Sequence, residues 1–266
     1  MAKDKFSAVW VSHSSIADYL KCPRAYFLRN LYRDLKTNHK VTVMSAPLAL
    51  GQAVHEVLEA LSVLPIEERF TTDLKVRYDR AWSKLPEVFR DGYDRGWNML
   101  QRVANNPGPL LNKAIKIRQD LPYFWLSEDD NIILCGKIDW LEYLPETDSV
   151  GILDFKTGKY DEDPESLQLP IYLLVASRCQ TRPVTKASYW YVDRDDAPKI
   201  MHLPDPQDSH AKLLNIAKKI ALARKLKHFV CPQNGGCRAC FELEAVVAGK
   251  GKYIGTDNIK RDVYIL

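Results

Sequence analysis

A stretch near the middle of the chain, GILDFKTGK (residues 151–159), places two opposite charges in an otherwise apolar sequence. The apolar residues predict a buried strand, and the Thr-Gly pair after them predicts the turn that ends it. Asp154 and Lys156 are two positions apart, so their side chains project from the same face of the strand. Burying a charge is costly unless it is paired or bound to a metal ion, so we expect a polar site at the end of this strand. A surface strand with an ordinary Asp–Lys ion pair is the alternative.

The composition is that of a globular protein. With 266 residues, 46% of them hydrophobic and 27% charged, the chain can bury the core of one large domain, with or without an inserted lobe. Its apolar runs are too short to span a bilayer, and its first residues lack the apolar segment of a secretory signal. The net charge of +4 permits an anionic partner but does not require one. We therefore expect a cytoplasmic protein.

The hydrophobic periodicity predicts helices first, then strands, then helices and strands in alternation. The helical segments are 14–33 (broken at Pro23), 46–64, 71–103, 164–178 and 208–229. The strands are 123–129, 131–144, 149–158, 186–193 and 197–203, with the first three as a meander. This order predicts an α/β fold with a mixed sheet. We expect a single domain, 1–266, with a helical insertion at about 70–105, a sheet core at 120–205 and irregular structure after Val230.

An acidic companion for Asp154 lies one strand earlier, at Asp139. If the two strands pair as a hairpin, the two carboxylates converge at one edge of the sheet. Carboxylate oxygens at a partly hydrated site suit Mg²⁺ or Mn²⁺, and such an ion can polarise a phosphoryl group and activate water. Lys156 can then hold the attacking water or neutralise charge that builds on the phosphate.

Two helices offer further polar groups. Gln168 and Tyr172 are four residues apart, so they share one face of a helix close to the end of the strand. His55 lies in the segment GQAVHEVLEAL, on a helix with an apolar face. A single histidine on a helix is also compatible with a purely structural role.

Taken in order, these elements resemble the RecB-like branch of the PD-(D/E)XK nuclease superfamily, which includes CRISPR-associated RecB-like exonucleases. The resemblance extends from SHSSIADYLKCPRAYFLRNLY to CPQNGGCRAC and includes GQAVHEVLE, GKIDWLEY, ILDFKTGK and QLPIY. It implies a restriction-endonuclease-like core, in which helices flank a central mixed sheet. It adds an N-terminal helical region and a cap formed by a cysteine cluster.

The resemblance also assigns roles. The implied metal ligands are His55, Asp139, Asp154 and the backbone carbonyl of Phe155. The implied catalytic residues are Lys156 and the two aspartates, and Gln168 and Tyr172 are expected to support the site and face DNA.

The implied activity is metal-dependent hydrolysis of DNA phosphodiester bonds. We expect an exonuclease that uses Mg²⁺ or Mn²⁺ on DNA that is single-stranded or has a free end, because a helical histidine ligand resembles the exonucleolytic branch. Its expected setting is recombination, repair or DNA processing in a prokaryotic or phage-infected cell, with a helicase or a recombination or CRISPR-adaptation protein as partner. Two alternatives remain: a non-catalytic DNA-binding subunit of such a complex, and a metal-binding scaffold without nucleic acid.

Four cysteines form a separate candidate metal site. Cys231, Cys237 and Cys240 have the spacing C-x5-C-x2-C, and Cys22 lies near the other end of the chain. By resemblance, one N-terminal and three C-terminal cysteines hold a 4Fe–4S cluster that ties the chain ends together. The usual order places a cysteine six residues after the C-x2-C pair, where this chain has Val246, so Cys231 is expected to supply the fourth ligand. Four thiolates also suit a tetrahedral Zn²⁺, and unligated thiols are a third interpretation.

Basic and aromatic residues alternate in two helical segments, a pattern typical of single-strand DNA channels. Arg24 and Tyr26, followed by Arg29 and Arg33, belong to the first segment, and we expect Arg24 and Tyr26 to contact DNA. The second segment is 77–102, with Trp82, Tyr93, Arg95 and Trp97. The alternative is that the aromatic rings pack into the core.

Overall fold

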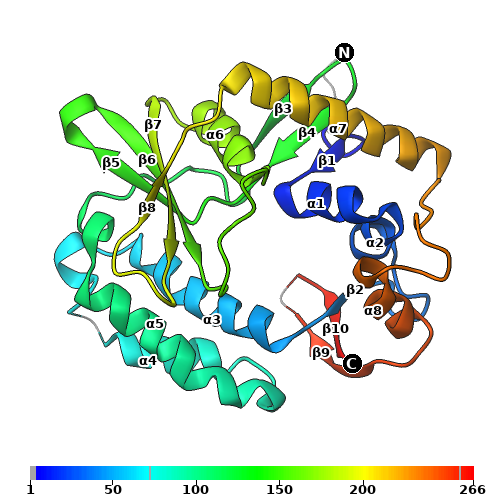
Figure 1. Ribbon diagram of the computed structural model, residues 1–266, viewed down its shortest axis with the longest axis horizontal. Helices are drawn as coiled ribbons and strands as arrows, with labels where there is room; N and C mark the ends of the chain where they lie inside the picture. Colours follow the sequence, from blue (N-terminus) through cyan, green and yellow to red (C-terminus); the bar gives the residue numbers. More distant parts are fainter. Residues whose placement is uncertain (1–3, 72, 258) are drawn as a thin grey trace. The chain divides into compact units, whose positions relative to one another are not determined.

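The computed structural model describes residues 4–71, 73–257 and 259–266. They form two compact parts, which we call the central part (46–124 and 136–209) and the terminal part (4–45, 125–135 and 210–266). The chain therefore enters and leaves each part more than once (Figure 1). Along the described ranges, no helix combines the length and apolar character needed to cross a bilayer.

The central part is built on a four-stranded mixed sheet. Its strands, in spatial order, are β5 (Trp140–Leu144), β6 (Ser149–Lys156), β7 (Val184–Tyr191) and β8 (Lys199–Met201). β6 is antiparallel to β5 and parallel to β7, and β7 is antiparallel to β8. The sheet is buried along most of β6, as expected for a strand covered on both faces.

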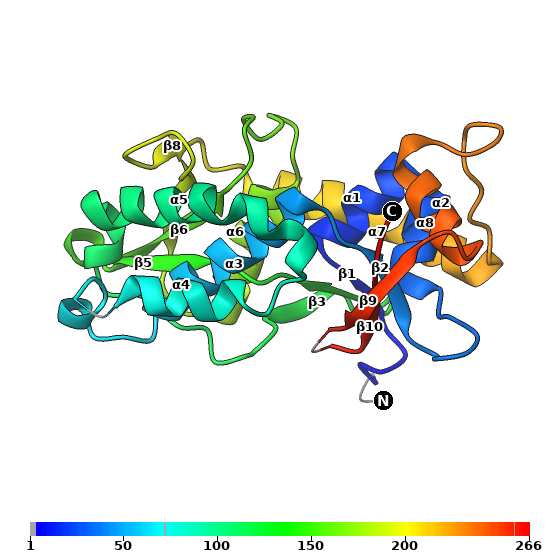
Figure 2. The same ribbon diagram turned by 90° about the horizontal axis from the view of Figure 1, so that it is seen from below.

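Helices cover both faces of this sheet (Figure 1). Three of them, α3 (Ala46–Leu61), α4 (Leu74–Trp82) and α5 (Tyr93–Asn105), share one apolar core with sheet side chains such as Leu153 and Phe155. Figure 2 shows α4 and α5 running alongside each other. On the opposite face α6 (Gln168–Cys179) packs against β7. The predicted α/β fold with a mixed sheet flanked by helices is confirmed.

The terminal part contains a three-stranded sheet and several helices. The sheet has the order β1 (Val9–Val11), β4 (Ile132–Cys135), β3 (Tyr123–Ser127), and β1 is parallel to β4. The helices are α1 (His13–Lys21), α2 (Pro23–Tyr26), a π-turn at Phe27–Leu31, α7 (Pro206–Leu226, from His210 in this part) and α8 (Arg238–Val247). Ser12 and Ser15 form a capping box that starts α1, and Pro23 starts the next helix, as its fixed φ favours.

A second sheet in the terminal part joins residues from both ends of the chain. Its order is β2 (Lys40–Val43), β10 (Arg261–Ile265), β9 (Lys252–Thr256), with β10 parallel to β2 and antiparallel to β9. The predicted irregular structure after Val230 is therefore wrong, because this segment forms α8 and two strands. β2 was also missed, since a four-residue strand is too short to show a clear period.

The expected three-strand meander is wrong as well. The apolar run 131–144 is interrupted at 136–139, so its first half (β4) and its second half (β5) belong to different sheets. At the break, the amide of Gly136 donates to the carbonyl of Pro122 (3.0 Å) instead of continuing a ladder. The helix expected from Pro164 begins at Gln168, after a turn.

Candidate functional sites

The two aspartates meet because of the register between β5 and β6. Trp140 is opposite Leu153, so the next step along the antiparallel pair puts Asp139 opposite Asp154. Asp154 is only 2% exposed. Burial, together with the negative charge of Asp139, raises the pKa of Asp154 to about 7, although Lys156 acts in the opposite direction. A buried carboxylate next to a second carboxylate is a site that favours a cation.

Asp139 is held from two sides. Its Oδ2 accepts a hydrogen bond from the backbone amide of Phe155 (3.0 Å) and lies 3.3 Å from Nδ1 of His55 on α3. Burial alone would lower the pKa of His55, but its interaction with Asp139 and the charges of nearby carboxylates outweigh burial and raise it. The nearby carboxylates therefore favour the protonated imidazole of His55.

Gly51 lets α3 come close enough to bring His55 to this place. A Cβ at residue 51 would lie 3.1 Å from the hydroxyl oxygen of Thr157, in the turn after β6. That distance is tighter than an ordinary van der Waals contact, so with a larger residue the turn or the helix would have to shift by a few tenths of an ångström. His55 follows about one helical turn later on the same helix.

Lys156 is the cation nearest to Asp154. Its Nζ lies 2.9 Å from Oδ2 of Asp154 and 3.1 Å from Oε2 of Glu162, and it donates to Oε1 of Gln168. Nζ also sits 4.7 Å from the centroid of the Tyr189 ring. Burial lowers the pKa of Lys156, but the two acidic neighbours more than compensate and raise it. The lysine is thus a fixed positive charge at the mouth of the strand.

Gln168 connects the Asp154 carboxylate to the Lys156 ammonium group. Its Nε2 donates to Oδ1 of Asp154 (2.8 Å) and to the hydroxyl of Tyr172 (3.1 Å), while its Oε1 accepts from Lys156. Both Gln168 and Tyr172 are 7% exposed. Their position is therefore that of a support beneath the carboxylate and the lysine.

The donor set fits a hard divalent cation. One ligand atom each from His55, Glu59 and Asp139 lie within 4.8 Å of one another. Among the described residues, Oδ2 of Asp154 is buried without a hydrogen bond, although Lys156 is close enough for an ion pair. The carboxylate oxygens suit Mg²⁺ or Mn²⁺, and the imidazole of His55 adds one nitrogen donor to the set. The role of the Phe155 carbonyl stays a prediction.

Two acidic residues of this site were missed from the sequence. Glu59 lies four residues after His55, so the helical repeat places both on one face, and this spacing was a usable signal. Glu162 lies in the loop between β6 and α6, where no periodicity indicates which way a side chain points. A cavity of about 260 Å³ reaches Asp139, with Lys116 and Lys137 also in its lining.

The four cysteines also come together. One sulfur from each of Cys22, Cys231, Cys237 and Cys240 lies within 4.8 Å of the others. The Cys237–Cys240 and Cys231–Cys240 sulfur distances are both 3.8 Å. With a zinc–sulfur bond of about 2.3 Å, the edge of a tetrahedron of thiolates is about 3.8 Å. A 4Fe–4S cluster holds its thiolates further apart, because each one binds a different iron.

Two of these cysteines cap helices. The sulfur of Cys22 accepts from the amide of Ala25 at the start of α2, and Cys237 is the N-cap of α8. Burial raises the pKa of Cys22. For Cys237, burial acts in the same direction, but the amides of Cys240 and Ala239 outweigh it and lower the pKa. A helix N-terminus favours a thiolate, which is the form that binds metal.

Arg24 and Tyr26 lie close to this cluster. Nε of Arg24 donates to Oε1 of Glu244 (2.5 Å), and the pair lines a cavity of about 620 Å³ that reaches Cys231 and Cys240. Tyr26 is 1% exposed, with its ring centroid 5.9 Å from that of Phe229. The buried ring of Tyr26 therefore cannot stack on a nucleobase. This agrees with the alternative in which the aromatic rings pack into the core.

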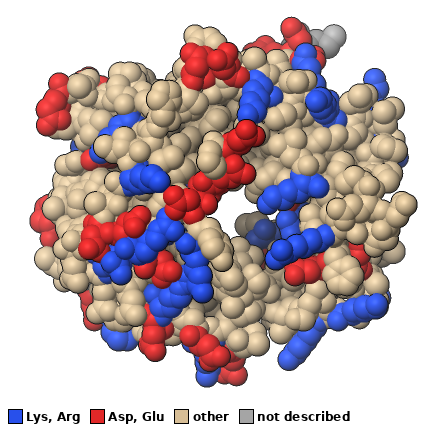
Figure 3. Space-filling view, in the orientation of Figure 1, with Lys and Arg blue, Asp and Glu red and all other residues tan. Residues whose placement is uncertain are grey.

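The second basic and aromatic segment is likewise engaged within the protein. Arg95 pairs with Asp193 (2.7 Å) and Arg102 with Asp196 (2.6 Å), so their charges are compensated. Trp97 stacks near Tyr78 in the core of α3–α5. On the face seen in Figure 3, basic and acidic side chains are interspersed over α5 and the β7–β8 region.

The fold and the acidic site together define a class of protein. A mixed sheet carrying two aspartates and a lysine at one strand end is the arrangement of a metal-dependent nuclease core. The PD-(D/E)XK nuclease superfamily matches residues 10–241, and the chain belongs to this superfamily. Its members are nucleases that use divalent metal ions. Among curated proteins, no match is found.

The raised pKa values of Asp154 and His55 predict how stability changes with pH. Without added divalent ions, the folded protein binds more protons than the unfolded chain between about pH 4 and pH 7, so the free energy of unfolding should fall as the pH rises through this range. Urea unfolding from pH 5.5 to 8 should show the decrease, and Asp154→Asn should lose most of it. Asp148→Asn, at an exposed carboxylate whose pKa is lowered by Arg182, should keep it. A flat wild-type profile would contradict the raised pKa values.

Proposed function

We propose that this protein is a Mg²⁺- or Mn²⁺-dependent deoxyribonuclease that removes nucleotides from DNA ends. The observation that carries the proposal is the buried Asp154, hydrogen-bonded to Gln168, ion-paired with Lys156 and close enough to Asp139 for that charge to raise its pKa. Membership of a nuclease superfamily supports the same reaction class. The RecB-like branch, the preference for ends and a role in DNA repair or recombination rest on the sequence resemblance.

Each side chain has a definite task in this proposal. His55, Glu59 and Asp139, whose ligand atoms lie within 4.8 Å of one another, would hold the divalent ion together with the neighbouring Asp154, and the ion when bound polarises the phosphodiester and lowers the pKa of water. Lys156 keeps a positive charge where the phosphate gains negative charge in the transition state. Gln168 holds the ammonium group and the carboxylate in register, so neither has to be repositioned during reaction.

A non-catalytic DNA-binding subunit is the second candidate. Such a protein would have no need of a lysine held between Asp154 and Glu162. The complete acid–lysine set therefore favours catalysis. A helicase or CRISPR-adaptation partner remains an expectation from the resemblance.

The test of the active site is hydrolysis of end-labelled linear DNA. Asp154→Ala and Asp139→Ala should lower the rate by at least about a hundredfold, because each removes a metal ligand. Glu59→Gln should raise the Mn²⁺ concentration needed for half-maximal rate. Glu56→Gln, the same change on the exposed side of the same helix, should leave it unaltered. Activity that persists in EDTA, or in Asp154→Ala, would refute the site.

The preference for ends is tested with matched circular and linear DNA. A covalently closed circle should resist hydrolysis, whereas the same DNA cut once should be degraded. The measurement is the loss of intact molecules with time in Mg²⁺ or Mn²⁺. Equal rates on both forms would assign an endonuclease while leaving the metal site unaffected.

We also propose that the four cysteines bind one metal centre that ties α2 to α8. The sulfur distances support a single tetrahedral Zn²⁺ over the 4Fe–4S cluster that the resemblance implies. A metal centre adds its binding free energy to folding, and it closes a loop over most of the chain.

Elemental analysis of the purified protein should give about one zinc per chain and no colour. Cys237→Ser and Cys22→Ser should lose the metal and lower the unfolding temperature, because the centre contributes to folding. Cys179→Ser, at a cysteine outside the cluster, should keep the metal. A brown protein with about four irons would establish the cluster and a wider sulfur arrangement. No metal, with unchanged stability of Cys237→Ser, would refute the centre.

A further inference from the structure

A groove in the terminal part is lined by positive side chains. Its volume is about 650 Å³, and its cationic lining residues are Arg29, Arg33, Lys40, Lys260 and Arg261. The remaining lining residues are neutral or histidine, and no carboxylate among the described residues lines it. The volume lies within the range of ligand pockets.

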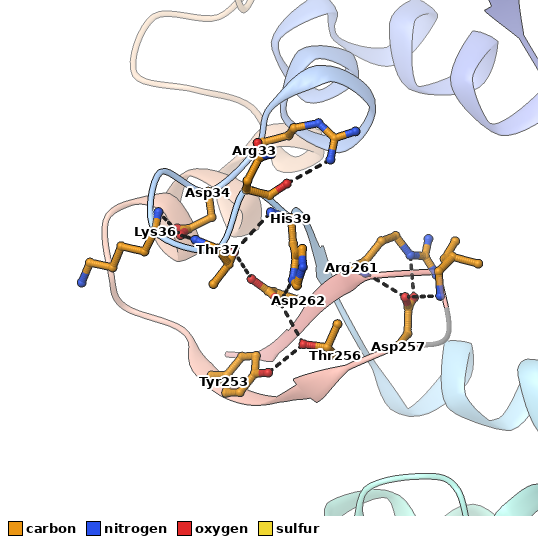
Figure 4. Close-up of polar contacts among 12 residues, drawn as sticks. Arg33, Asp34, Lys36, Thr37, His39, Tyr253, Thr256, Asp257, Arg261 and Asp262 are labelled. Carbon is orange, nitrogen blue, oxygen red and sulfur yellow. Dashed lines mark hydrogen bonds and ion pairs between the residues drawn. The ribbon is translucent and has the colours of Figure 1, made fainter.

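The parallel pairing of two strands brings part of this charge together. Lys40 begins β2 and Arg261 begins β10, and the two are direct register partners. Arg33 approaches from the turn before β2, where its Nη1 donates to the carbonyl of Asn38 (3.0 Å; Figure 4). Like charges held close together on neighbouring strands repel each other. An anion bound between these cationic side chains would reduce their repulsion.

Only part of the charge is compensated within the protein. Arg29 pairs with Asp18 (2.6 Å), and Arg261 pairs with Asp257 (2.6 Å). Within the described ranges, Arg33, Lys40 and Lys260 form no ion pair. Burial lowers the pKa of Lys40, and the charges of Arg33, Arg224 and Arg261 lower it further. The groove is thus a site of unbalanced positive potential.

A buried carboxylate makes the wall of the groove rigid without neutralising it. Asp262 is 1% exposed and accepts hydrogen bonds from Thr37 (2.5 Å), His39 (2.9 Å) and Thr256 (3.0 Å), as Figure 4 shows. Burial alone would raise the pKa of Asp262, but these three donors lower it. Both oxygens face β9 and the 37–39 turn. The carboxylate therefore fixes the segments that carry Lys40 and Arg261.

We propose that this groove binds the phosphodiester backbone of a DNA strand, as a site separate from the acidic group of the central part. The inference rests on the proposed function for the identity of the polymer. Arginine and lysine side chains next to neutral polar groups are the chemistry of phosphate contacts. Among the described lining residues there is no phenylalanine, tyrosine or tryptophan, and the ring of His39 is held by Asp262, so the groove lacks the large stacking surfaces of single-strand readers and recognition is expected to be independent of sequence.

The test is binding of a fluorescein-labelled 20-nucleotide single strand, followed by anisotropy without added divalent ion. The variant Lys40→Gln/Lys260→Gln should weaken binding by about tenfold and reduce the salt slope by about 1.4, the value for two lost contacts to a single strand. The matched control, Lys212→Gln/Lys250→Gln, removes the same charge from exposed lysines of the same part that do not line the groove. It should bind within about twofold of wild type. Equal losses in both variants would overturn the groove, because only overall charge would then matter.

Two further arms separate the explanations. If the double variant unfolds at a lower temperature than wild type, the single variant Lys260→Gln, at an exposed position, replaces it in the binding test. This single variant should reduce the salt slope by about 0.7. Binding to anionic lipid vesicles that depends on Lys40 and Lys260, with unchanged oligonucleotide binding, would also overturn the proposal.

Hydrolysis of thymidine 5′-(p-nitrophenyl) phosphate in Mn²⁺ reports on the acidic site by itself. Groove variants should keep the wild-type rate on this small substrate. If no form hydrolyses DNA or this ester but only the groove variant loses oligonucleotide binding, the proposed function fails and the groove stands. If hydrolysis proceeds and the groove variant binds normally, the groove fails and the function stands.

Discussion

The antiparallel register between β5 and β6 is the constraint on which the acidic site depends. It pairs Trp140 with Leu153 and so brings Asp139, the residue before Trp140, next to Asp154; a shift of one residue would turn one of the two carboxylates to the other face of the sheet. The register is secured by burial, since Trp140 and Leu153 are both 1% exposed in the core below α3. The polar site is therefore positioned by apolar packing. The energetic cost of bringing two carboxylates together is met by Lys156, His55 and Gln168.

Much of the central part follows from patterns in the sequence. The strand with Asp154 and Lys156 was predictable from its continuous apolar run, and the helix with His55 was predictable from apolar residues at helical spacing. The break at 136–139 was not predictable, since the apolar run continues on both sides and only the change of sheet reveals it. Glu162 was out of reach for a similar reason, because a loop has no period.

The terminal part was predicted less well, for a physical reason. Its second sheet pairs residue 40 with residue 261, and no local pattern reports a partner so far away. Tyr26 illustrates the same limit. Its alternation with arginines suggested an exposed ring, whereas its environment is set by Phe229, which lies far along the chain. The basic groove likewise exists only once β10 lies next to β2.

This topology has a consequence for the order of events during synthesis. All residues of the central part are available once position 209 has been translated, whereas β2 and Cys22 wait for segments near the other end. At 5–20 residues per second, the delay between residues 45 and 261 is roughly 10 to 40 s. During that interval β2 lacks its partner strand β10, and Cys22 lacks the other cysteines of its cluster. Both can then form contacts with wrong partners. The cysteine cluster can therefore form only after residue 240 has been translated, and the β2–β10 pair only after residue 265.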